Sequence, residues 1–130
     1  MVIDSSARVA IALREPDCSF YLDRIAEAAA KWISAASLLE TSIVVNREKG
    51  SSGICVLRRF VADADIRVAE FSENQVQLAF AAHKSFGKSM GHPAQLNILE
   101  CCTHALAAEL EEPVLFKGGD FDKTDIGIVS

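Results

Sequence analysis

The spacing of apolar residues along the chain limits the fold more than any other feature. Short apolar runs alternate with longer stretches in which apolar residues recur at helical intervals. The runs are residues 2–3, 31–34, 66–71 and 113–116, with 126–129 as a candidate edge strand. Short strands separated by helices are typical of a parallel sheet covered on both faces. The sequence therefore predicts a three-layer α/β/α fold with a central parallel sheet.

The helical stretches carry recognisable start and stop signals. Ser6 is a candidate N-cap for the first helix and Ser72 for the helix that runs to about residue 86. Residues 50–53, Gly-Ser-Ser-Gly, are expected to end the helix that begins near residue 36. The remaining helices are predicted from about residues 16 to 29, 52 to 61 and 96 to 110. Each helix follows a strand or another helix closely, as a compact α/β domain requires.

Length and composition indicate one globular domain over residues 1–130. The chain is 50% hydrophobic and 24% charged, which is ordinary globular usage. Its four cysteines have no metal-binding spacing, so neither a zinc site nor a disulfide framework is indicated. No apolar run approaches the ~18 residues of a membrane span, and residues 1–4 lack the pattern of a secretion signal. We expect a cytoplasmic protein with no membrane partner.

The net charge of −5 excludes one class of nucleic-acid-binding protein. A chain with a pI of about 5.1 cannot coat nucleic acid through broad neutralisation of phosphates. A divalent cation held by carboxylates would reverse the local field where a phosphate binds. Chemistry on a phosphodiester is therefore expected only at a local acidic site.

Four acidic residues lie where a parallel sheet would bring them together. They are Asp4, Glu40, Glu100 and Asp120. Ligand sites in open α/β sheets lie beyond the carboxyl ends of the strands. At 4 Å and an effective dielectric of about 20, two carboxylates repel by roughly 4 kcal/mol, which a hard cation such as Mg²⁺ or Mn²⁺ would relieve. Such ions promote phosphodiester hydrolysis without a side-chain nucleophile.

Each acid also has a structural alternative. Asp4 is a candidate helix cap, and Asp120 a turn residue. Ser37 and Glu40 match a capping box, in which the carboxylate would bind only backbone amides. Glu100 is four residues before His104 and could pair with it along the helix. These alternatives stay open at the level of the sequence.

Four segments, taken in order along the chain, carry a family resemblance. They are Met1-Val-Ile-Asp-Ser-Ser-Ala7, Ile33-Ser-Ala-Ala-Ser-Leu-Leu-Glu-Thr41, Phe86-Gly-Lys with His92-Pro-Ala-Gln-Leu-Asn97, and Leu115-Phe-Lys-Gly-Gly-Asp-Phe-Asp-Lys-Thr-Asp-Ile126. Together they resemble the VapC toxins, ribonucleases of the PIN-domain family. The resemblance implies a PIN domain and a metal-dependent endoribonuclease that is a toxin inhibited by a VapB antitoxin and usually a homodimer. It also implies that Asp4, Glu40, Glu100 and Asp120 are the catalytic metal ligands, with Ser6 supporting Asp4.

The chain departs from this family at two positions. Glu100 stands where aspartate is expected, after Leu99 where glycine is expected. Gly119 replaces a residue that is often polar or acidic, which leaves Asp122 and Asp125 as the weaker substitutes for Asp120. An alternative function is therefore a catalytically impaired PIN-fold protein that binds antitoxin or RNA without cleaving.

Residues 82–89 contain a second, weaker set of signals. They match a relaxed phosphate-loop pattern, but they follow a helix rather than a strand, which argues against nucleotide binding. Lys88, together with His92 shortly after the pattern, gives this part of the chain a local positive charge. They are weak candidates for RNA contacts, with a solvated loop as the alternative.

Overall fold

A four-stranded parallel sheet organises the chain, and the computed structural model describes residues 1–130. The strands are β1 (Val2–Ile3), β2 (Trp32–Ser34), β3 (Arg67–Ala69) and β4 (Val114–Leu115), arranged in the order β3-β2-β1-β4. The strand β1 pairs in parallel with both β2 and β4. The predicted parallel α/β architecture is confirmed.

Successive residues of the central strands point to opposite faces of the sheet. Val2 and Val114 are buried in one hydrophobic cluster, whereas Ile3 and Leu115 are buried in the other. This is the alternation that the pleat of a β-strand imposes. Because both faces are covered, both residues of these very short strands are apolar and fully buried.

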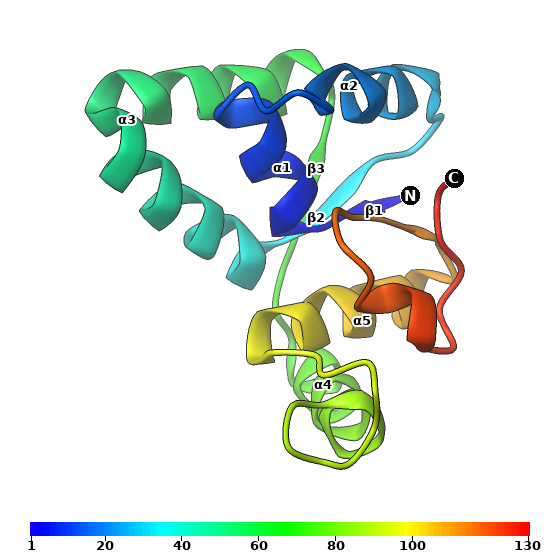
Figure 1. Cartoon of the computed structure of the whole chain (residues 1–130). Coiled ribbons are helices and arrows are strands. Elements are labelled where there is room, and N and C mark those ends of the chain that lie inside the picture. The colour runs from blue at the N-terminus through cyan, green and yellow to red at the C-terminus, as the bar shows by residue number, and fades with distance from the viewer.

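Helices form a layer on each face of the sheet. They are α1 (Ser5–Ala12), α2 (Cys18–Glu27), α3 (Ala35–Asp63), α4 (Glu73–Phe86) and α5 (Ile98–Leu110). Figure 1 shows α1, α2 and α3 on one side of the strands and α4 and α5 on the other. The predicted three-layer arrangement is confirmed.

The long helix α3 bends sharply at Gly50. This residue has φ 65° and ψ −159°, a conformation that non-glycine side chains strongly disfavour. The predicted break at residues 50–53 is therefore confirmed, although no loop separates the two halves of α3. Figure 1 shows the halves as the arms of a V with α1 lying between them.

Two details differ from the sequence predictions. The first helix begins at Ser5, and its N-cap is Asp4 rather than Ser6, because the Asp4 carboxylate accepts the amide hydrogen of Ser6. Residues 126–129 form a single parallel bridge, between Val114 and Ile128, and no strand. Ser72 does cap α4, as predicted, by accepting the amide hydrogen of Gln75.

None of the helices is long and apolar enough to cross a membrane.

Candidate active site

A cleft of about 420 Å³ lies beyond the carboxyl ends of the strands. Asp4 follows β1, and Glu40 lies in the second turn of the helix that follows β2. Because β1, β2 and β4 are parallel, the residues after them meet at one edge of the sheet. The cleft is lined by Asp4, Ser5, Ser6, Val9, Glu15, Glu40, Val44, Asn97, Glu100 and Lys117.

Asp4 is buried, with 1% of its surface exposed, and is held by three hydrogen bonds. Its Oδ2 accepts from the amide of Ser6 at 2.9 Å and from the Ser6 hydroxyl at 2.7 Å. Its Oδ1 accepts from the hydroxyl of Thr103 at 2.8 Å. Ser6 thus contacts Asp4 through both its amide and its hydroxyl, and Asp4 is at once a helix cap and a residue lining the cleft.

Thr103 is a site residue that the sequence analysis did not identify. It is fully buried on α5, three residues after Glu100 and so on the same side of that helix. That spacing was the only signal in the sequence that pointed to it. Because carboxylate ligands are commonly oriented by hydrogen-bonded neighbours, Thr103 qualifies as a positioning residue for Asp4.

A buried arginine lies behind the acids. Arg8 is 1% exposed, its Nη2 donates to the hydroxyl of Ser37 at 2.7 Å, and its Nε donates to the carbonyl of Asp4 at 3.3 Å. Burial lowers the pKa of its guanidinium to about 10, and the charges of Asp4 and Glu40 oppose that shift. Arg8 therefore supplies a positive charge beneath the cleft, while its Nη1 has no hydrogen-bond partner.

Glu40 is free of the capping role that its sequence context allowed. The helix α3 begins at Ala35 with Ser34 as N-cap, so Ser37 lies inside the helix and donates its hydroxyl hydrogen to the carbonyl of Ser34. The predicted alternative of a Ser37–Glu40 capping box is therefore wrong. The half-buried carboxylate of Glu40 faces the cleft.

Glu100, in contrast, does form a capping box. Its Oε2 accepts from the amide of Asn97 at 2.8 Å, while Asn97 Oδ1 accepts from the amide of Glu100 at 2.9 Å. The expected alternative pair with His104 is wrong, because His104 Nε2 lies 2.7 Å from Asp125 Oδ1. Burial, followed by the negative charges of Asp120 and Asp4, raises the pKa of Glu100 to about 7.

Of the three C-terminal acids, Asp120 lies nearest to the cluster. It precedes the short 3-10 helix η1 (Phe121–Lys123), and its charge acts on Glu100. Asp125 is bound to His104, and Asp122 is exposed. Asp120 is therefore the C-terminal acid that interacts with Glu100, although it does not line the cleft, and Asp125 makes a different contact.

The acids share one region but do not surround a single point. No three His, Cys, Asp or Glu side chains are grouped so that they could hold a metal ion. The donors are nevertheless hard carboxylate oxygens, and the negative charges of Asp120 and Asp4 add to the effect of burial in raising the pKa of Glu100. By donor chemistry the residues fit a divalent cation such as Mg²⁺ or Mn²⁺.

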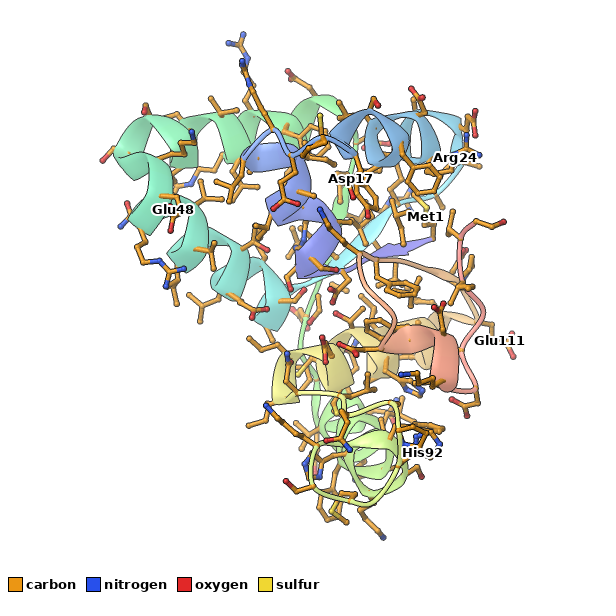
Figure 2. The ribbon with its side chains drawn as sticks, viewed as in Figure 1. Met1, Asp17, Arg24, Glu48, His92 and Glu111 are labelled. Atoms are coloured by element: carbon orange, nitrogen blue, oxygen red, sulfur yellow. The ribbon has the colours of Figure 1, made fainter.

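Lys88 and His92, the weak candidates for RNA contacts, do not line the cleft. The Lys88 amide donates to the carbonyl of Leu96, and the His92 ring packs edge-on against Phe86 with centroids 5.0 Å apart. Figure 2 shows His92 on the loop beside α4, at the opposite end of the molecule from the bend of α3. The structure gives both residues a place in the loop and no link to the acidic cluster.

Comparison with known families assigns the class of the protein. The PIN domain profile matches residues 1–127, and the chain belongs to the PIN-domain family. Within it, the chain is 39% identical over 126 residues to ribonuclease VapC28 of Mycobacterium tuberculosis, covering 97% of this chain and 95% of that protein. It is 36% identical over 129 residues to ribonuclease VapC of Mycolicibacterium smegmatis, covering 99% of each. The resemblance to the VapC ribonucleases is therefore confirmed.

Solved structures of low sequence identity share the fold. The toxin VapC20 of Mycobacterium tuberculosis, described as cleaving the sarcin-ricin loop, superposes with a TM-score of 0.78 at 13% identity, over 98% of this chain and 97% of that one. A toxin–antitoxin complex from Klebsiella pneumoniae gives a TM-score of 0.73 at 12% identity, over 99% and 95% of the two chains. At such low identity these likenesses establish the PIN fold alone.

The raised pKa of Glu100 predicts how the stability of the metal-free protein depends on pH. In the unfolded chain this pKa returns to its ordinary value of 4.5, so between about pH 4.5 and 7 the folded state retains a proton that the unfolded state has lost. The resulting stabilisation is complete below pH 4.5 and is lost as the pH rises through 7. Glu100→Gln keeps an acceptor for the capping box and removes the charge.

We therefore expect Glu100→Gln to raise the melting temperature at pH 8 by a few degrees and to change it little at pH 5. Thermal unfolding followed by circular dichroism in EDTA measures both. Glu70→Gln is the matched control, because Glu70 is exposed and does not line the cleft. An equal effect of Glu100→Gln at the two pH values would contradict the assignment of the shift to Glu100.

Proposed function

We propose that the protein is a metal-dependent endoribonuclease and the toxin of a VapBC toxin–antitoxin pair. The observation that carries this proposal is the convergence of Asp4, Glu40 and Glu100 on one cleft, with Asp120 beside Glu100, in a chain of the VapC family. A divalent ion bound there would neutralise the carboxylates, draw charge from a phosphodiester oxygen and increase the acidity of a water molecule.

Hydrogen bonds from other residues of the chain orient the carboxylates of Asp4 and Glu100. Ser6 and Thr103 hold the two oxygens of Asp4 from different elements, α1 and α5. Asn97 holds one oxygen of Glu100, and the carboxylate still lines the cleft. Preorganised carboxylates of this kind lose little entropy when the substrate complex forms. The longer side chain of Glu100 reaches the cleft while its own capping box fixes it.

Metal binding by Asp4 is the first test of this function. We expect calorimetry to show Mn²⁺ binding to the wild type and none to Asp4→Asn, and RNA cleavage to be lost with it. Thr103→Val removes only the hydroxyl that orients Asp4, so the metal affinity should fall about 10- to 100-fold. Thr103→Ser, which retains the hydroxyl, should bind like the wild type.

The alternative function, an impaired PIN-fold protein, predicts a different result. It is favoured by the capping box, which engages the Glu100 carboxylate at a position where the family has aspartate. In that case the purified wild type would cleave no RNA with Mg²⁺ or Mn²⁺. Cleavage by a Leu99→Gly, Glu100→Asp variant would then identify the two substitutions as the cause.

We infer that the antitoxin partner docks in a second cavity, the groove between α1 and the two arms of α3. Its volume is about 370 Å³. The groove is lined by Arg8, Ile11, Ala12, Arg14, Val45, Lys49, Ser52, Gly53, Val56, Leu57 and Phe60. Three of these residues are cations and none is acidic, so an apolar partner segment that carries carboxylates is complementary to it. The unpartnered Nη1 of Arg8 is a hydrogen-bond donor that such a carboxylate could satisfy.

Val56 provides the test of this groove because its side chain is 65% exposed there. We expect Val56→Arg to abolish co-purification with the small protein encoded beside the toxin gene and to leave the free toxin folded. Val76→Arg is the matched control, since Val76 is 49% exposed on α4, in the other helical layer. Equal retention of the partner by both variants would place the antitoxin elsewhere.

We also propose that the protein is a homodimer. Leu39 and Ile43 are 63% and 58% exposed, and their i, i+4 spacing places them on one face of α3. Large apolar side chains clustered on a surface are typical of an interface. Light scattering should report a dimer for the wild type and a monomer for Ile43→Lys. Met90→Lys, at a position that is 49% exposed on the loop after α4, should remain dimeric.

A further inference from the structure

The cleft carries an excess of negative charge, which opposes the binding of a polyanionic substrate. Among the residues that line it, Asp4, Glu15, Glu40 and Glu100 are acidic, and Lys117 is the only cation. A phosphate group that enters this region meets an excess of negative charge, which one divalent ion would only partly neutralise. The ammonium group of Lys117 is therefore the one positively charged side chain in the cleft that is available to an RNA phosphate.

The backbone of Lys117 is fixed relative to the acidic cluster. Its amide donates to the hydroxyl of Ser6 at 2.9 Å, and that hydroxyl donates to Asp4 Oδ2 at 2.7 Å. A further bond joins the amide of Asp4 to the carbonyl of Leu115 at 2.9 Å. Lys117 thus lies at a defined distance from Asp4 whatever its own side chain does. Replacing that side chain leaves these backbone contacts in place.

The Lys117 ammonium is currently held by two acids of the segment that joins α1 to α2. It donates to Asp17 Oδ1 at 3.0 Å and to the carboxylate of Glu15. Both contacts raise the pKa of Lys117, so the group is charged throughout the physiological range. All three side chains are about one third or more exposed. Exposed ion pairs of this kind are only weakly stabilising, so the ammonium can exchange one of them for a phosphate at little cost in free energy.

The flexible four-carbon stem of lysine allows such an exchange. We propose, building on the ribonuclease function proposed above, that Lys117 binds a backbone phosphate of the RNA strand, and that Glu15 and Asp17 hold its ammonium when no RNA is present. The two acids act as internal competitors of the substrate. In the bound state the ammonium turns from them toward the phosphate while the amide stays on Ser6.

A purely structural role for Lys117 makes different predictions. If the lysine only fastens the α1–α2 segment to the end of β4, its removal lowers stability and leaves RNA affinity and its salt dependence unchanged. A phosphate contact, in contrast, weakens binding of any RNA sequence when it is lost and reduces the slope of log affinity against log salt by about 0.7 for a single strand. The salt slope therefore separates the two roles.

The experiment is a fluorescence anisotropy titration of a labelled single-stranded RNA oligonucleotide in EDTA at several salt concentrations. We expect Lys117→Gln to weaken binding about 3- to 10-fold near 0.1 M salt with the reduced slope. Lys117→Arg keeps the charge and should bind like the wild type. Lys123→Gln is the control for charge alone, because Lys123 is exposed on η1 and does not line the cleft.

A double-mutant cycle tests the internal competition. Removing the charges of Glu15 and Asp17 with Glu15→Gln, Asp17→Asn should strengthen RNA binding through the released ammonium. The same pair of substitutions made together with Lys117→Gln should give a clearly smaller gain, since only the general loss of negative charge remains. Equal gains in the two backgrounds would overturn the competition, and an unchanged affinity and slope in Lys117→Gln would overturn the phosphate contact.

Cleavage measured on the same variants distinguishes this proposal from the ribonuclease function itself. A higher KM with a similar kcat in Lys117→Gln supports both. If the wild type cleaves RNA and Lys117→Gln has the same KM, the phosphate contact is refuted and the ribonuclease function stands. If RNA binding depends on Lys117 but no metal activates cleavage, the ribonuclease function is refuted and the phosphate site stands.

Discussion

The parallel pairing of β1 with both of its neighbours is the interaction on which the site depends. It places the end of β1 between the ends of β2 and β4, so residues from three distant parts of the chain meet around Asp4. The strands are only two or three residues long, and their position is maintained by complete burial of Val2, Ile3, Val114 and Leu115. The geometry of the candidate site is therefore a consequence of core packing.

The acidic side chains that meet around Asp4 repel one another, and several neighbouring groups reduce this repulsion. Hydroxyl and amide donors hold Asp4, and the buried Arg8 lies behind Asp4 and Glu40. The pKa of Glu100 is raised chiefly by burial, and the charges of Asp120 and Asp4 raise it further. The repulsion that remains is what a divalent cation would relieve. The same excess of negative charge explains why a single lysine at the edge of the cleft would matter for a polyanionic substrate.

The comparison of Glu40 with Glu100 shows why a short motif cannot decide between a structural and a catalytic role. Both lie three residues after a side chain that can cap a helix, Ser37 or Asn97. The cap forms only at Asn97, because α5 begins there, whereas α3 begins two residues before Ser37. The residue at which a helix begins depends on where the preceding strand or loop ends in space, and the tertiary structure sets that position.

The sequence by itself determined the fold class, the four strands of the sheet and most helix limits, because burial on both faces of a sheet and glycine conformation at Gly50 leave local signatures. It also identified Asp4, Glu40, Glu100 and Asp120 as the candidate acids. Only the tertiary structure revealed the roles of Thr103, Arg8 and Lys117, since their partners lie 29 to 111 positions away along the chain. Contacts of that kind depend on how the layers pack, and no local pattern of residues encodes them.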